Sequence, residues 1–253
     1  MIFSKNSPFS ILNSPLINAT FVKNLTMIAK DTLSFLNDLK NNNNRDWFHA
    51  SKKRYEKAKQ NIIDVTAFLT SEIGKFDNDI QAFDPKKGLF RIARDVRFSN
   101  DKTPYKTNFG TCISSKGKNI YNYSTYYLHV DPEQSFFSSG VYMPDKDYLN
   151  LVRNAIYYDF PSFEAIVRNK DFVAKFGELA EEPEMKKLTR VPNNFDKNSP
   201  AAEYLKYKNF YVFVNISTES LMDENLFTKE VLSAAKLMKP FNDFFNHTVV
   251  ENA

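Results

Sequence analysis

The spacing of apolar side chains changes twice along the chain, and this change restricts the fold more than any other feature. Apolar residues have helical spacing in residues 28–75, alternate with polar ones over much of residues 90–142, and return to helical spacing after residue 145. Helix-forming stretches therefore flank a strand-forming stretch. This order predicts an α+β fold, in which several α-helices pack on an antiparallel-rich β-sheet, and it argues against an alternating α/β fold.

The same spacing gives the expected elements. We expect helices at residues 28–39, 44–75, 145–157, 161–170, 201–208 and 226–238, and strands at residues 90–98, 109–114, 125–130, 136–142 and 210–216. The last strand is apolar on both faces, which predicts an internal strand covered on both sides. Asn44 is expected to cap the second helix, because its side-chain oxygen can accept a hydrogen bond from an unpaired backbone N–H.

Length and composition favour a single domain. The 253 residues are 42% hydrophobic and contain neither an internal repeat nor a linker, so we expect one core. The domain is expected at residues 31–246, followed by a C-terminal tail at residues 247–253. Residues 1–30 contain no Asp or Glu, and we expect either a poorly ordered extension there or an alternative start at Met27.

Cysteine and hydropathy limit the expected surroundings. The single cysteine, Cys112, rules out an intramolecular disulfide and suits a reducing compartment, so we expect a cytoplasmic protein. No stretch approaches the roughly 18 consecutive apolar residues that a membrane-spanning helix requires, and we expect no membrane partner. The sequence does not indicate an oligomeric state.

Positive charge is concentrated in one segment. Residues 86–106 hold seven cations and two anions, a local net charge of +5, whereas the whole chain carries only +4. The remaining residues are therefore nearly neutral. Such a concentration of Arg and Lys is typical of a site that attracts an anion.

Several separated motifs carry a family resemblance. They are FRIARDVRFSNDKTPYK at residues 90–106, NNRDWFHA at 43–50, FDPKKGLF at 83–90, YYLHV at 126–130, VYMP at 141–144 and RVPNNFDK at 190–197. Through them the chain resembles a conserved-hypothetical family of bacteria and some fungi, domain of unknown function 2461, over about residues 31–246. The resemblance implies the extent of the domain and no particular reaction.

Arg94 is the cation whose position is hardest to explain from sequence. In the expected strand at residues 90–98 it shares the apolar face of Ile92 and Val96. A buried arginine stays charged and needs carboxylate, carbonyl or ligand partners. Two interpretations stay open: a structural ion pair or bulge, and an arginine that points into a ligand pocket.

The expected ligand site is a cluster of cations around this strand and the loop that follows it. Planar guanidinium groups donate paired hydrogen bonds to phosphate or carboxylate, and lysines add point charge. No glycine-rich phosphate loop accompanies the cluster, so a P-loop mechanism has no support. The candidate ligand-binding residues are Arg91, Arg94, Arg97, Lys102, Tyr105 and Lys106, with Trp47 and Arg190 as conditional members.

Catalytic signatures are weak. His129 shares an expected strand face with Tyr127 and Asp131, which suits a general acid or base, although a packed structural histidine fits the same pattern. Asp95 is the second weak candidate. The three histidines show no metal-ligand spacing, so we expect no metal site, and no motif indicates a cofactor.

The sequence therefore predicts a domain that binds a small anionic ligand, bearing phosphate or carboxylate, at the Arg and Lys cluster. An enzyme acting on such a substrate is compatible with the same residues. A nucleic-acid-binding module is a less favoured alternative, because aromatic residues near cations can stack on bases, yet no recognition motif is present. A protein-interaction or scaffold domain is the remaining alternative.

Overall fold

The computed structural model describes residues 27–97, 99–114 and 122–248. It shows an α+β fold with one four-stranded sheet, as the sequence predicts. Residues 1–26 of the expected N-terminal extension, Phe98 of the expected first strand, residues 115–121, and residues 249–253 of the expected C-terminal tail lie outside the described residues. Among the helices of the described part, none combines the length and the apolarity needed to cross a membrane.

The described part of the chain begins with three helices, α1 (Lys30–Asn41), α2 (Arg45–Ala50) and α3 (Lys52–Ile73). Met27 and Ile28 are fully buried, so the core includes residues that precede α1. The cap is confirmed, because Asn44 Oδ1 accepts a hydrogen bond from the Trp47 N–H at 2.9 Å. The single helix expected at residues 44–75 is wrong in one respect: it breaks at Ser51, whose ψ of 12° departs from helical geometry.

The sheet consists of β1 (Phe109–Ile113), β2 (Thr125–Val130), β3 (Ser135–Val141) and β4 (Phe210–Ile216), in that order and antiparallel throughout. These four strands confirm the strands expected at residues 109–114, 125–130, 136–142 and 210–216. The short elements η2 (Asn78–Ile80) and α4 (Pro85–Gly88) connect α3 to the segment before β1.

A long crossover separates β3 from β4. It contains α5 (Lys146–Tyr158), α6 (Phe160–Val167), α7 (Lys170–Phe176), η3 (Pro183–Met185) and α8 (Ala202–Leu205). The chain then forms α9 (Thr218–Met222), α10 (Glu224–Asp243) and the π-helical turn η4 (Phe244–Thr248). Contrary to the expected end at residue 238, α10 continues through Pro240.

The two faces of the sheet have different environments. One face carries Tyr126, Leu128, Val130, Phe137 and Val212, all buried in the core, where α3 contacts β1 and α10 contacts β3. The opposite face carries the alternate side chains and is hollowed. β4 is therefore an edge strand with one covered face, and the prediction of an internal strand covered on both sides was wrong.

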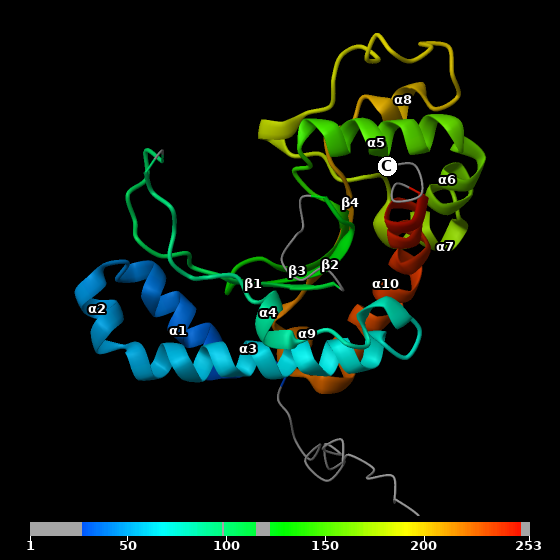
Figure 1. Ribbon diagram of the computed structural model, residues 1–253. Coiled ribbons are helices and arrows are strands. Elements are labelled where there is room, and N and C mark those ends of the chain that lie inside the picture. Colours follow the sequence, from blue (N-terminus) through cyan, green and yellow to red (C-terminus); the bar gives the residue numbers. More distant parts are fainter. Residues whose placement is uncertain (1–26, 98, 115–121, 249–253) are drawn as a thin grey trace, which may run out of the picture.

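The expected strand at residues 90–98 is also wrong. The described residues 91–97 and 99–105, which we call the basic arm, double back on themselves and project from the sheet on the side of α1 and α2 (Figure 1). Among its described residues, pairing is limited to isolated bridges and to backbone bonds such as Arg94 N to Pro104 O at 2.9 Å. Burial still alternates along the arm, with Ile92 buried between exposed Arg91 and Ala93. The predicted alternation was therefore correct, although the segment does not pair as a strand of the sheet.

Candidate functional site

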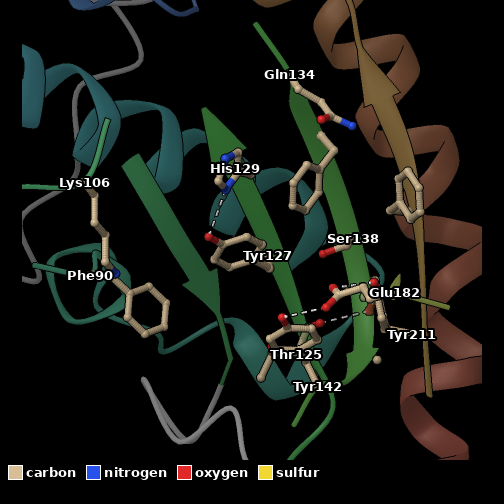
Figure 2. A pocket seen from close by; sticks show the side chains of 14 residues that line it. Phe90, Lys106, Thr125, Tyr127, His129, Gln134, Ser138, Tyr142, Glu182 and Tyr211 are labelled. Carbon is tan, nitrogen blue, oxygen red and sulfur yellow. Dashed lines mark hydrogen bonds between the residues drawn. The ribbon is translucent and has the colours of Figure 1, made fainter. Parts of the chain in front are cut away.

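The open face of the sheet forms a cavity of about 510 Å³. This volume lies in the range of roughly 300–1,000 Å³ that small-molecule pockets occupy. Strands β2, β3 and β4 supply most of the lining, and Glu182 of the crossover completes it. Lining side chains include Phe90, Lys106, Tyr127, His129, Gln134, Phe136, Tyr142, Glu182, Tyr211 and Phe213 (Figure 2).

Aromatic rings form much of the cavity surface. The His129 and Phe136 rings stack at 4.6 Å between centroids, and Phe136 meets Phe213 edge to face at 5.9 Å. Farther along the sheet, Tyr142 and Tyr211 lie perpendicular to each other, at 5.4 Å and 89°. Flat apolar surface of this kind suits the body of an organic ligand.

Gly140 permits this arrangement of β3 and β4. Its φ of +132° is one that L side chains rarely adopt, and a Cβ there would lie 2.1 Å from the Phe210 carbonyl oxygen. Only a residue without a side chain lets the two strands approach as closely as they do at the pocket floor.

His129 and Tyr127 form a polar pair on β2. Tyr127 Oη lies 3.2 Å from His129 Nδ1. Burial lowers the pKa of His129; Asp131 opposes this effect and Lys106 adds to it. Because the ordinary histidine pKa is about 6.5, the imidazole is mainly neutral at pH 7, and Tyr127 can donate its proton to Nδ1.

Lys106 brings a positive charge to the pocket without a counter-ion. Its side chain is half-buried, and Nζ lies 5.7 Å from the centroid of the Phe90 ring. Across the described residues, no carboxylate oxygen lies within 4 Å of Nζ. Burial lowers the pKa of Lys106, and repulsion from Arg91 lowers it further.

Glu182 brings a negative charge from the opposite side. Its Oε1 accepts a hydrogen bond from the Tyr211 hydroxyl at 2.9 Å, and its Oε2 accepts one from Tyr142 at 3.4 Å. No Lys, Arg or His nitrogen of the described part forms an ion pair with Glu182. Lys106 and Glu182 lie on opposite sides of the view in Figure 2, across β2 and β3.

The structure divides the predicted ligand residues into two groups. Lys106 alone of the six lines the cavity, at the base of the basic arm. Arg94 bonds to Asp101 and Thr103 within the arm, and Arg97 pairs with Asp95 at 2.7 Å. Arg91 and Lys102 are exposed on the same arm.

The other candidates lie elsewhere. Tyr105 stacks on Phe48 of α2 at 4.0 Å and fixes the arm to the helical layer. Trp47 stacks on Phe35 at 6.0 Å, and Arg190 is exposed in the loop before α8. Of the two acid–base candidates, His129 lines the pocket, whereas Asp95 lies on the arm.

One group of described residues has the geometry of metal ligands. Ligand atoms of Asp79, Asp243 and His247 lie within 4.8 Å of one another near the end of α10. Lys239 Nζ donates a hydrogen bond to Asp243 and already supplies positive charge to this carboxylate. A cation would have to displace that ammonium group, so these residues are a poor match to a metal site.

Glu182, Tyr142 and Tyr211 line the cavity but were not among the residues predicted from the sequence. Tyr211 and Phe213 alternate with buried residues of β4, and this alternation was the available signal for a pocket face. Glu182 stands in an irregular segment without periodicity, and no local signal distinguishes it from its acidic neighbours.

Comparison with known proteins identifies one family. A family model described as a conserved hypothetical protein (DUF2461) matches residues 31–244. No curated protein and no solved structure shows a significant match to the chain.

Proposed function

The chain belongs to the DUF2461 family of conserved hypothetical proteins, and we propose that it binds a small organic anion in the pocket on the open face of its sheet. Lys106 contacts the phosphate or carboxylate of this ligand. The aromatic rings of β2, β3 and β4 contact the apolar body.

The observation that carries this proposal is the charge of Lys106. A half-buried ammonium group has lost part of its hydration, and no carboxylate of the described residues replaces it. Burial of an unpaired charge is unfavourable, and an anion in the cavity relieves this cost. The lowered pKa of Lys106 reports the same unfavourable environment.

The composition of the pocket supports a ligand with an apolar body. Phe90, Phe136 and Phe213 add apolar surface to a cavity with few charged groups. Inorganic phosphate alone would leave these rings without contacts. An aryl or alkyl phosphate, or a carboxylate of similar size, satisfies both parts of the pocket.

The basic arm favours a small ligand over nucleic acid. A nucleic-acid groove requires a track of cations that phosphates can reach. Arg94 and Arg97 instead bond to Asp101 and Asp95 on the arm itself. The nucleic-acid hypothesis predicts that an oligonucleotide binds in place of small anions, and the experiment below includes that ligand.

The test compares Lys106→Met with Lys102→Met. Lys102 is an exposed lysine of the same arm whose Nζ bonds to the Val96 carbonyl at 3.0 Å, so it provides a matched loss of charge outside the pocket. Calorimetric titration with phenyl phosphate, benzoate, hexanoate, inorganic phosphate and a short single-stranded oligonucleotide measures the affinities.

We expect the organic anions to bind wild type and Lys102→Met equally. In Lys106→Met the affinity should fall by at least tenfold, which corresponds to about 1.4 kcal/mol. Equal losses in both variants would place the anion on the arm and overturn the proposal. Binding confined to the oligonucleotide would favour the nucleic-acid alternative.

A further inference from the structure

We infer that the ligand of this pocket also carries a protonated amine, which binds at Glu182 between the rings of Tyr142 and Tyr211. This inference rests on the proposed function, because it concerns the same cavity. It narrows the ligand class from organic anions to molecules with an anionic group at one end and an ammonium group at the other.

The hydrogen bonds of Glu182 leave acceptor capacity on both of its carboxylate oxygens. An ionised carboxylate can accept about four hydrogen bonds. Tyr211 supplies one to Oε1 and Tyr142 supplies a longer one to Oε2, so each oxygen keeps further capacity toward the cavity. An ammonium group has three N–H donors and the opposite charge, and it meets both requirements of this carboxylate.

Tyr142 and Tyr211 form an aromatic corner beside Glu182. Their rings are perpendicular, at 89° and 5.4 Å between centroids, and both line the cavity beside Glu182. A cation in such a corner lies over the negative face of one ring and near the hydroxyl of the other. Aromatic corners of this kind, with a carboxylate, recognise alkylammonium groups through cation–π attraction.

The cavity contains two groups of opposite charge, and neither has an ionic partner among the described residues. Lys106 and Glu182 line the same pocket from opposite sides, and neither forms an ion pair within the described ranges. A purely anionic ligand would satisfy Lys106 and bring repulsion to Glu182. A ligand that bears both charges neutralises both groups and spans the aromatic surface between them.

The experiment uses three series of ligands with matched carbon chains. These are ω-amino acids from 4-aminobutanoate to 8-aminooctanoate, the n-alkanoates of equal length, and the N-acetylated ω-amino acids. Acetylation removes the positive charge without any change to the protein, so this comparison does not depend on the folding of a variant. Affinities are measured by calorimetric titration at pH 7.

In the wild type we expect one chain length to bind at least tenfold more tightly than its alkanoate, because only a matching span reaches both charges. The N-acetyl compound should lose this advantage. Glu182→Gln should abolish the tenfold advantage and raise alkanoate affinity, because it removes the repulsion between two negative charges. Glu184→Gln, an exposed neighbour in η3, is the matched control and should behave as wild type.

The outcomes separate the two proposals. Alkanoates that bind through Lys106 without any gain from the amine would overturn this inference and leave the proposed function standing. Loss of ω-amino-acid affinity in Glu182→Gln but not in Lys106→Met, with no binding of alkanoates, would leave the ammonium at Glu182 and overturn the anion site at Lys106 that the proposed function requires. An amine advantage that survives in Glu182→Gln would place the ammonium elsewhere and contradict the inference, and absence of binding in all series would contradict both.

Discussion

The basic arm and the pocket differ in whether their charged side chains have ionic partners. On the arm, Arg94 bonds to Asp101 and Arg97 bonds to Asp95, over sequence separations of seven and two residues. In the pocket, Lys106 and Glu182 have no ionic partner within the described residues, although the cavity holds few charges. On the arm, the two acids pair with two of the four cations, whereas neither charge of the pocket has an ionic partner among the described residues.

This comparison teaches that the density of charge along a sequence is a weak indicator of a binding site. An exposed ion pair contributes little, because water competes for both partners. An unpaired charge in a partly dehydrated cavity contributes more to binding, because a ligand of opposite charge can replace the hydration that burial removed. The following predictions test whether the arm and the pocket differ in this way.

The largest effect is expected at the pocket floor. Gly140→Ala should lower the free energy of unfolding by about 3 kcal/mol, because the backbone there has a positive φ and a Cβ meets the Phe210 carbonyl. Urea denaturation followed by circular dichroism measures the change. Gly177→Ala, at a positive φ with nothing within 4 Å of the new Cβ, separates backbone strain from steric clash. An equal loss in both variants would mean that strand approach is unimportant.

On the arm, Arg94→Ala should lower the thermal unfolding midpoint by about 2–4 °C and leave ligand affinity unchanged. The side chain is 25% exposed and joins Asp101 to Thr103, so its removal loosens the arm alone. Differential scanning calorimetry and titration with the best organic anion check both parts. A tenfold loss of affinity would remove the distinction between the two regions and return Arg94 to the ligand site.

In the pocket, removal of a cation should raise the stability of the protein, whereas removal of Arg94 on the arm should lower it. Lys106→Met keeps an unbranched side chain, one atom shorter, and removes a half-buried charge, so the unliganded variant should be more stable than wild type by about 0.5–1 kcal/mol. Chemical denaturation without ligand measures this gain. Lower stability of Lys106→Met would show that the ammonium has a partner that stabilises the fold.

The smallest effect concerns His129. Burial lowers its pKa in the folded state, so the unfolded chain binds more protons below about pH 6.5, and stability falls as pH decreases from there toward the folded-state pKa. Between pH 7.5 and 5.5, wild type should therefore lose a few tenths of a kcal/mol more than His129→Gln. Denaturation curves at the two pH values test this, and equal losses would contradict the lowered pKa.

Much of the fold could be predicted because its signals are local. The strands at Phe109–Ile113 and Thr125–Val130 were expected from their local sequence, the strand at Phe210–Ile216 from its apolar run, and the Asn44 cap from residue type. The arm was mistaken for a strand because an extended segment with one packed face shows the same period as a paired strand. The two-residue alternation of apolar and polar side chains indicates which side of a segment is buried. It does not indicate whether the segment pairs with a neighbouring strand.

The site was harder to predict for a related reason. Lys106 was identified within a charged segment, but its importance depends on what surrounds it after folding. Tyr211 and Glu182 join Tyr127 only through the pairing of β3 with β4, which no local pattern encodes. Apolar residues on both faces of β4 indicated burial, whereas one of those faces lines a cavity.

The crossover between β3 and β4 has a consequence for the order in which the molecule folds. The meander β1–β2–β3 closes short loops, whereas pairing of Val141 with Phe210 must first bring together chain ends separated by residues 142–209. Loop closure over such a distance costs more chain entropy, and non-local pairing slows folding. Tyr211, Phe213 and Glu182 all depend on this step, so the pocket is complete only when the last strand docks. A refolding chain should acquire sheet structure before it can retain a ligand.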